Sequence, residues 1–272
     1  MITLTDIITH KKLEVEKNKS LYPVQLLESS LYYKSKAVSL KKYLLRPDKN
    51  GIIAEIKKKS PSIGDINKYA NVEKISIGYM QAGASALSVL TDKDFFGGSN
   101  ADLTIARKYN FCPILRKDFT IDAYQIIEAK SIGADVILLI AAVLSKENIK
   151  EFTDLAHSLE MEVILEIHDA SELEKIYDKV DVIGINNRDL NTMKINIEHS
   201  AQISEMLPKN IIRISESGIQ TPEHIIYLKQ FGYQGFLIGS NFMKHAEPHL
   251  VCKQFINDLV EKQGLKKILH KN

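Results

Sequence analysis

The chain of 272 residues is 44% hydrophobic and 26% charged, which is enough apolar material for one large core or two small ones. Its formal charge of +2 argues against nucleic acid or an anionic membrane surface as the main partner. The two cysteines, Cys112 and Cys252, lie far apart and indicate neither a disulfide framework nor a metal-ligand spacing. The N-terminus lacks the apolar core of a signal peptide, and the longest apolar run, residues 136–144, is too short to span a bilayer. We therefore expect a soluble, cytoplasmic protein.

Residues 1–48 predict a helical extension that packs on the rest of the chain. Amphipathic stretches near residues 4–17 and 40–45 lie on either side of Pro23. An extension of this kind can act as a lid, as a cap over one end of the fold or as an oligomer contact, and the sequence does not distinguish these roles. We expect a monomer, with a homodimer as the alternative.

From residue 49 onward, short apolar runs alternate with amphipathic segments. The runs are rich in Ile, Val and Leu on both faces, which is typical of strands in a buried parallel sheet. Segment 145–159 has a helical stripe of apolar residues that Ser145 is expected to cap. Gly83, Gly133 and Gly232 precede strands and indicate turns at helix ends. The predicted strands are 51–57, 84–90, 112–117, 135–140, 162–166, 180–185, 211–215 and 235–239.

Eight such alternations over roughly 200 residues predict a (β/α)₈ TIM barrel for residues 49–272, in one domain with the extension. A doubly wound open sheet is the competing architecture. No G-x-G-x-x-G motif follows the first run, and polar residues recur at strand ends along the whole chain. An open sheet would concentrate them at one crevice, so the pattern favours the barrel.

Charged residues occur within these apolar runs, near their carboxyl ends. Burying an unpaired charge is costly, whereas in a barrel these ends face the mouth, where active sites lie. In the first run Glu55 and Lys57 are two residues apart and share a face. The alternative is that these residues form structural salt bridges. This explanation is less favoured because charged or polar residues occur at the same end of five strands. The candidates at these ends are Glu55, Lys57, Lys117, Glu166, Asn186, Arg188 and Glu216.

A second group of candidates predicts a phosphate site. Residues 215–218 (Ser-Glu-Ser-Gly) and 239–241 (Gly-Ser-Asn) follow the last two predicted strands, where barrels commonly bind phosphate. Glycine lets backbone N–H groups approach the anion, and Ser217 and Ser240 add hydroxyl donors. The basic loop 57–64, which contains Ser60, is suited to close over an anionic substrate.

Aromatic and histidine residues carry weaker signals. Phe96 and Phe119 offer apolar surface for an aromatic ring, although plain packing explains such residues more often. His168 is interpreted as a loop residue rather than a base. His245 and His249 are four residues apart, but Pro248 disrupts a helical pair and no third ligand is evident, so no metal site is expected.

Several segments together resemble the indole-3-glycerol phosphate synthase family from about residue 50 to 245. The most specific are E-I-K-x-x-S-P-S, which begins at Glu55, and N-x-R-D-L, which begins at Asn186. Further matches are the segments 115–119, 133–140 and 237–240. Two departures are visible: Ile63 replaces a frequent lysine, and Gly97 replaces a usual polar residue.

The resemblance implies a (β/α)₈ barrel with an extra N-terminal helix and with no metal or organic cofactor. It implies the conversion of 1-(2-carboxyphenylamino)-1-deoxyribulose 5-phosphate to indole-3-glycerol phosphate, CO₂ and water. The implied phosphate-binding residues are Lys57, Ser217, Gly218, Gly239 and Ser240, and Ser60, Phe96 and Phe119 are added as substrate contacts. The implied catalytic residues are Glu55, Lys57, Lys117, Glu166, Asn186, Arg188, Glu216 and Ser217.

The chemistry suggests roles for these residues. Lys117 is the natural acid at the ketone oxygen, and Glu55 or Glu216 would stabilise the cationic ring nitrogen. Lys57 or Arg188 would hold the substrate carboxylate that leaves as CO₂. Dehydration would use Glu166 as one member of an acid-base pair, with Lys57 or Lys117 as the other, and Asn186 would orient the lysine or a substrate hydroxyl.

Three rival hypotheses remain. The first is a Schiff-base aldolase with Lys117 as nucleophile. The second is a phosphoribosyl isomerase barrel, which would need a Cys/Asp or Asp/Asp pair. The third is a non-catalytic scaffold, which the filled strand-end positions disfavour.

Overall fold

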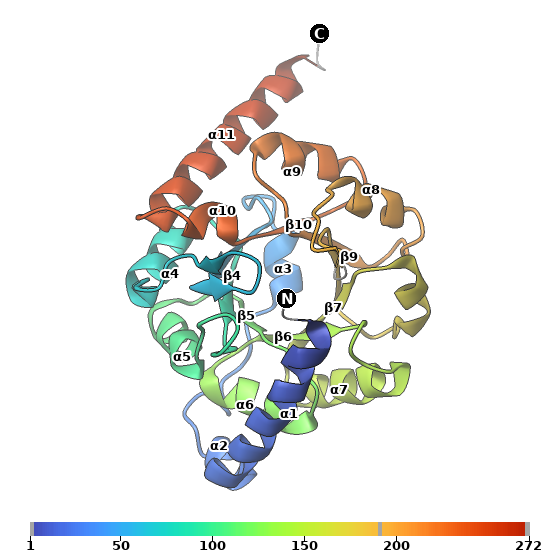
Figure 1. The fold of residues 1–272 in the computed structure, drawn as a ribbon. Helices are drawn as coiled ribbons and strands as arrows, with labels where there is room; N and C mark the ends of the chain where they lie inside the picture. Colours follow the sequence, from blue (N-terminus) through green and yellow to red (C-terminus); the bar gives the residue numbers. More distant parts are fainter. Residues whose placement is uncertain (1–2, 190–191, 270–272) are drawn as a thin grey trace.

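In the computed structural model, which describes residues 3–189 and 192–269, eight parallel strands close into a barrel. Leu190, the last residue of the N-x-R-D-L motif, lies outside the described residues. Figure 1 shows the strands around a common axis with helices outside them. The predicted (β/α)₈ barrel is confirmed and the open sheet is wrong. The strands are β1 (Ile52–Ile56), β4 (Ala86–Leu90), β5 (Ile114–Lys117), β6 (Val136–Ile140), β7 (Glu162–Ile167), β8 (Val182–Asn186), β9 (Ile212–Glu216) and β10 (Gly235–Ile238).

Each strand is buried on both faces, which explains the continuous apolar runs. In β1, Ile53 points into the barrel interior, whereas Ile52 and Ala54 belong to the outer cluster between the strands and the helices. Pairing of Ile53 with Ala86 of β4 and Leu237 of β10 sets the register around β1. This alternation carries Glu55 to the same side as Ile53, one step closer to the mouth.

Helices cover the outside of the barrel. Ser145 caps α7 (Lys146–Ser158) as predicted, since its Oγ accepts the N–H of Asn148 at 3.2 Å. The predicted third strand began too early, because Pro113 has no N–H for the ladder and β5 starts at Ile114. The helices are α4 (Val72–Gln81), α5 (Asn100–Tyr109), α6 (Ala123–Ile132), α7 (Lys146–Ser158), η1 (Ala170–Lys175), α8 (Glu198–Ser204), α9 (Pro222–Lys229), α10 (Ser240–Met243) and α11 (Pro248–Leu269).

Turns at helix ends follow the glycine pattern of the sequence. Gly83, Gly133 and Gly232 all have positive φ, and Gly133 is the left-handed C-cap of α6. The first loop contains a short hairpin that the sequence did not predict, made of β2 (Lys59–Ser60) and β3 (Gly64–Asp65).

The segment before β1 contacts both ends of the barrel. It contains α1 (Leu4–Leu21), α2 (Val24–Glu28) and α3 (Leu40–Leu44). Figure 1 shows α1 running from near the barrel axis outward over α6. Leu40 and Leu44 of α3 are buried in the same cluster as Ile53, and Ser39 contacts Glu162 at the start of β7. Thus α3 closes the amino end of the barrel, while α1 lies at the carboxyl end. No helix within the described residues is both long and apolar enough to cross a membrane.

Candidate active site

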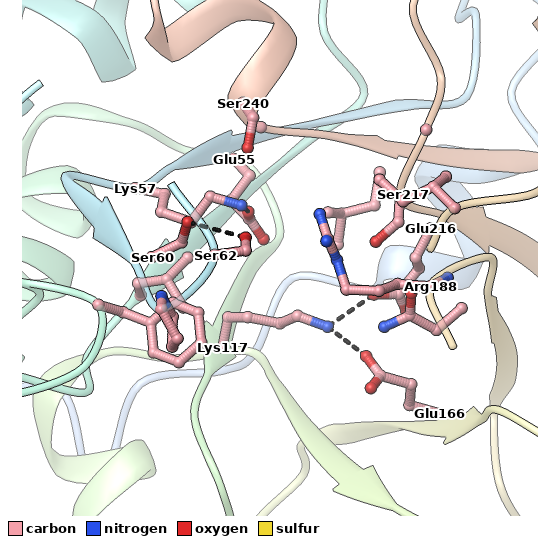
Figure 2. Close-up of a pocket in the computed structure, with 18 of the residues that line it drawn as sticks. Glu55, Lys57, Ser60, Ser62, Lys117, Glu166, Arg188, Glu216, Ser217 and Ser240 are labelled. Atoms are coloured by element: carbon pink, nitrogen blue, oxygen red, sulfur yellow. Dashed lines mark hydrogen bonds and ion pairs between the residues drawn. The ribbon is translucent and has the colours of Figure 1, made fainter. Parts of the chain in front are cut away.

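A cavity of about 370 Å³ lies at the carboxyl ends of the strands. Leu4 and Ile7 of α1 form part of its wall. Figure 2 shows side chains from several strands converging there. Every residue that the sequence predicted for the site lines this cavity. These are Glu55, Lys57, Ser60, Phe96, Lys117, Phe119, Glu166, Asn186, Arg188, Glu216, Ser217, Gly218, Gly239 and Ser240.

The centre of the site is Lys117, which lies between two glutamates. Its Nζ is 2.5 Å from Glu166 Oε2 and 2.6 Å from Glu216 Oε2 (Figure 2). Burial alone would lower the pKa of Lys117, but the charges of Glu166, Glu216 and Glu55 outweigh burial and raise this pKa above its ordinary value. The resting lysine is therefore an ammonium.

The two glutamates around Lys117 differ in protonation. Burial raises the pKa of Glu216 to about 8, because Lys117 only partly offsets it and Glu166 adds to it. Burial opposes the charge of Glu166 as well, but Lys117 and His168 together bring the pKa of Glu166 well below its ordinary value. Near neutral pH, Glu166 is therefore an anion and Glu216 holds a proton.

A second ion pair lies across the cavity. Lys57 Nζ is 3.0 Å from Glu55 Oε1, and Ser88 donates to Glu55 Oε2 at 3.3 Å. The missing side chain of Gly239 makes room for this glutamate, since a Cβ there would lie 2.4 Å from Glu55 Oε1. Gly184 makes room for Glu216 in the same way, since a Cβ on Gly184 would lie 2.4 Å from Glu216 Oε1.

The predicted phosphate residues sit on the turns after β9 and β10. Ser217 and Gly218 have φ of 69° and 80°, a left-handed turn that suits glycine at the second position. Asn187, which the sequence analysis missed, holds this turn by donating to the Ser217 carbonyl at 3.0 Å and to Ser215 Oγ at 2.9 Å. Ser240 begins α10 directly after Gly239.

The remaining predicted residues form the outer walls. The side-chain oxygen of Asn186 accepts the N–H of Arg188 at 3.0 Å, and the guanidinium of Arg188 donates to the Met193 carbonyl at 3.1 Å. Burial lowers the pKa of Arg188. The rings of Phe96 and Phe119 lie 5.9 Å apart, centroid to centroid, on one side.

The first loop contains Ser60 and Ile63, one of the two departures from the family pattern, and the other, Gly97, lies in the loop between β4 and α5. Ser60 Oγ is 3.4 Å from Ser62 Oγ (Figure 2). Ile63 is 57% exposed yet contributes to the cavity wall. Gly97 has φ of 66°, which gives a physical reason for glycine at this position.

Sequence reasoning missed two other groups. His168 follows β7 as a loop residue, as expected, but its side chain is 6% exposed and its Nε2 is 3.1 Å from Glu166 Oε1. Its spacing of two residues from Glu166 was an available signal. Lys11 of α1 is fully buried, with its Nζ 2.8 Å from Asp92 and 3.0 Å from Asp118, the neighbour of Lys117. Lysine is rarely buried, so no sequence pattern indicates this contact.

Among the described residues, one group of side chains has the spacing of metal ligands: His10, Glu14 and Asp94 place ligand atoms within 4.8 Å of one another. The Lys11 ammonium is 3.0 Å from Glu14, so a second cation there would be repelled. In the cavity, Glu55, Glu166 and Glu216 each have an ammonium partner.

Comparison with solved structures supports the barrel fold. The tryptophan synthase α-subunit of Pyrococcus furiosus superposes with a TM-score of 0.59 at 17% identity, covering 79% of this chain and 99% of that one. A chain of the tryptophan synthase α₂β₂ complex from the same organism gives 0.59 at 16% identity, with the same coverage of both chains. At these identities the likeness concerns the fold alone.

Comparison of sequences identifies the family. The family model described as indole-3-glycerol phosphate synthase matches residues 4–255. A protein of that name from Bacteroides thetaiotaomicron is 45% identical over 253 residues, which cover 93% of this chain and 97% of the relative. One from Caldanaerobacter subterraneus subsp. tengcongensis is 41% identical over 255 residues, with the same two coverages. The resemblance seen in the motifs is confirmed, and the chain belongs to the indole-3-glycerol phosphate synthase family.

Proposed function

We propose that this cavity converts 1-(2-carboxyphenylamino)-1-deoxyribulose 5-phosphate to indole-3-glycerol phosphate, CO₂ and water. One observation carries the proposal: the Lys117 ammonium lies between two buried glutamates, 2.5 Å from Glu166 Oε2 and 2.6 Å from Glu216 Oε2. The reaction needs an acid at a ketone oxygen and later an acid and a base for loss of water. The turns at Ser217 and Ser240 supply a place for the phosphate.

Ring closure comes first. The ring carbon that bears the carboxylate forms a bond to the ketone carbon, and the carbonyl electron pair moves to oxygen, which takes a proton from Lys117. The positive charge that develops on the ring nitrogen is stabilised by Glu55, a buried carboxylate across the cavity. The substrate carboxylate lies against Lys57 or Arg188 until the bond to CO₂ breaks. Its electrons then return to the ring, and no base is required.

Dehydration uses the unequal glutamates. Glu216 contacts Lys117 at 2.6 Å and returns a proton to it. Lys117 passes that proton to the hydroxyl, which leaves as water, while Glu166 takes a proton from the neighbouring carbon. Two protons are delivered and one is removed, so one proton comes from solvent, as loss of CO₂ from a carboxylate requires.

The rival chemistries fit this site less well. A Schiff-base aldolase needs a neutral amine, whereas two carboxylates hold Lys117 as an ammonium. Borohydride with a ketose phosphate should therefore leave Lys117 unmodified. A Cys/Asp isomerase would need its thiol at the mouth, but Cys112 precedes β5 at the amino end and is 1% exposed.

The test is direct. Purified protein given the carboxyphenylamino substrate should produce the fluorescence of indole-3-glycerol phosphate. Lys117→Met, which keeps the length of the side chain without its charge, should lower kcat by at least about 10²-fold, the usual contribution of a general acid. Gly264→Ala is the matched control, since nothing lies within 4 Å of a Cβ there. Absence of product from the unmodified protein would refute the proposal.

A further inference from the structure

The His168 ring lies in the cavity wall, fixed beside Glu166. Its Nε2 is 3.1 Å from Glu166 Oε1, the oxygen that Lys117 does not contact. The backbone of His168 is held on both sides: its N–H donates to Glu172 Oε2 at 2.8 Å, and its carbonyl oxygen is 2.8 Å from His199 Nε2. These two contacts hold the backbone from which the ring reaches Glu166.

The second oxygens of the two carboxylates on Lys117 differ in their surroundings. Glu166 Oε1 lies 3.1 Å from the imidazole Nε2, an ion-pair contact rather than a hydrogen bond, whereas Glu216 Oε1 is buried and has no hydrogen-bond partner among the described residues. Two buried carboxylates on one ammonium cannot both ionise at low cost, because each disfavours the charge of the other. The group at the second oxygen then determines which of the two keeps its charge.

We propose that His168 is a positioning residue that keeps Glu166 ionised, so that Glu216 is the carboxyl that carries the proton. The inference rests on the proposed function, because it explains how that reaction obtains its base and its acid from two like side chains. A protonated ring places a positive charge 3.1 Å from Glu166 Oε1, and this charge favours the anion of Glu166.

The groups that face the ring come from three elements. Glu166 of β7 and Glu172 of η1 favour a protonated imidazole, whereas burial and Lys117 of β5 oppose it. Glu216 of β9 contacts Lys117, and His199 of α8 contacts the backbone of His168 rather than its ring. Burial lowers the pKa of His168, but Glu166 and Glu172 outweigh burial and raise this pKa above its ordinary value.

The first test measures kcat and KM against pH. His168→Phe keeps the ring volume and removes both nitrogens, and His168→Gln restores one N–H donor. In His168→Phe, the fall of kcat on the acidic side of the pH profile should move to higher pH by about one unit. At pH values below this fall, kcat should be roughly tenfold lower than in the unmodified protein, while KM changes little. His168→Gln should restore part of this shift. His157→Gln is the matched control, because its Nε2 is 2.8 Å from Asp181 in a histidine–aspartate pair outside the cavity lining.

The outcome that overturns the inference is an equal fall of kcat at every pH with the limb unmoved, since that would show a packing role alone. An additive loss in the double variant with Glu166→Gln would overturn it too, because His168 is expected to act only through Glu166.

A second test does not depend on turnover. The titration of the His168 ring is followed by NMR in the unmodified protein and in Glu166→Gln. The midpoint should fall in Glu166→Gln, because the carboxylate charge is lost. Equal midpoints would refute the contact. A protein that forms no product but shows the fall refutes the proposed function and leaves the His168–Glu166 contact established.

Discussion

Replacing Lys11 with methionine tests how the N-terminal helix is fastened to the barrel. The Lys11 ammonium is fully buried and lies 2.8 Å from Asp92 Oδ2 and 3.0 Å from Asp118 Oδ1. Methionine keeps most of the apolar stem, so the substitution mainly removes the charge. Asp92 and Asp118 have side chains that are 0% and 2% exposed, and both would lose this cation.

The size of the effect follows from what remains around each carboxylate. Arg116 stays 3.6 Å from Asp118, and Asp92 still accepts the N–H of Phe95 at 2.8 Å. This partial compensation places the expected loss at the lower end of the range for breaking a buried ion pair, about 3 kcal/mol of unfolding free energy. Release of α1 from the barrel would let water reach both aspartates and would limit the loss.

Urea unfolding of Lys11→Met, Lys11→Arg and Lys12→Met measures the free energy, because Lys12 is exposed and serves as the matched control. Amide hydrogen exchange of α1 separates global loss from local release. Since α1 supplies Leu4 and Ile7 to the cavity wall, kcat/KM should fall together with protection of α1. Equal unfolding midpoints for Lys11→Met and Lys12→Met would refute the reasoning.

Three further predictions concern the cavity. Because the pKa of Glu216 is about 8 in the folded protein and its ordinary value is 4.5, its contribution to stability is full below pH 4.5 and is lost as the pH rises through about 8. The free energy of unfolding should differ less between pH 5 and pH 9 in Glu216→Gln than in the unmodified protein. An equal difference in the two proteins would contradict this pKa. Gly184→Ala should displace Glu216 from Lys117 and lower kcat at least about tenfold, whereas Gly264→Ala should keep kcat and gain up to about 1 kcal/mol. In Gly218→Ala, the Cβ would lie 2.4 Å from Ile195 at a φ of 80°, so KM should rise and inhibition by inorganic phosphate should weaken, and unchanged inhibition would place the phosphate elsewhere.

The sequence was sufficient to predict the barrel because its strands are buried on both faces. Runs such as residues 136–140 leave little choice but a parallel strand, and the spacing of Glu55 from Lys57 fixed their shared face. The same spacing relates Glu166 to His168, which was nevertheless interpreted as a plain loop residue. Histidine after a strand has many roles, so spacing alone did not decide between them.

Other features could not be read from local pattern. The burial of Lys11 depends on two aspartates more than eighty residues away along the chain, and helical periodicity contains no such information. The role of Asn187 depends on a turn that follows another strand, β9. The short hairpin at residues 59–65 lies in a loop whose composition indicates only a polar, basic segment. In each case the determining contact is tertiary.

Gly184 and Gly239 show that the chemistry of the mouth dictates parts of the barrel wall. A Cβ on either glycine would lie 2.4 Å from a glutamate oxygen, on Glu216 and Glu55 respectively, so Gly184 within β8 and Gly239 directly after β10 leave space in the same way. Glycine weakens a strand at Gly184, and the unpartnered buried oxygen of Glu216 costs free energy as well. Both choices oppose stability, so the fold alone does not explain them. They are explained if the site must hold the side chains of Glu216 and Glu55 within reach of the same substrate.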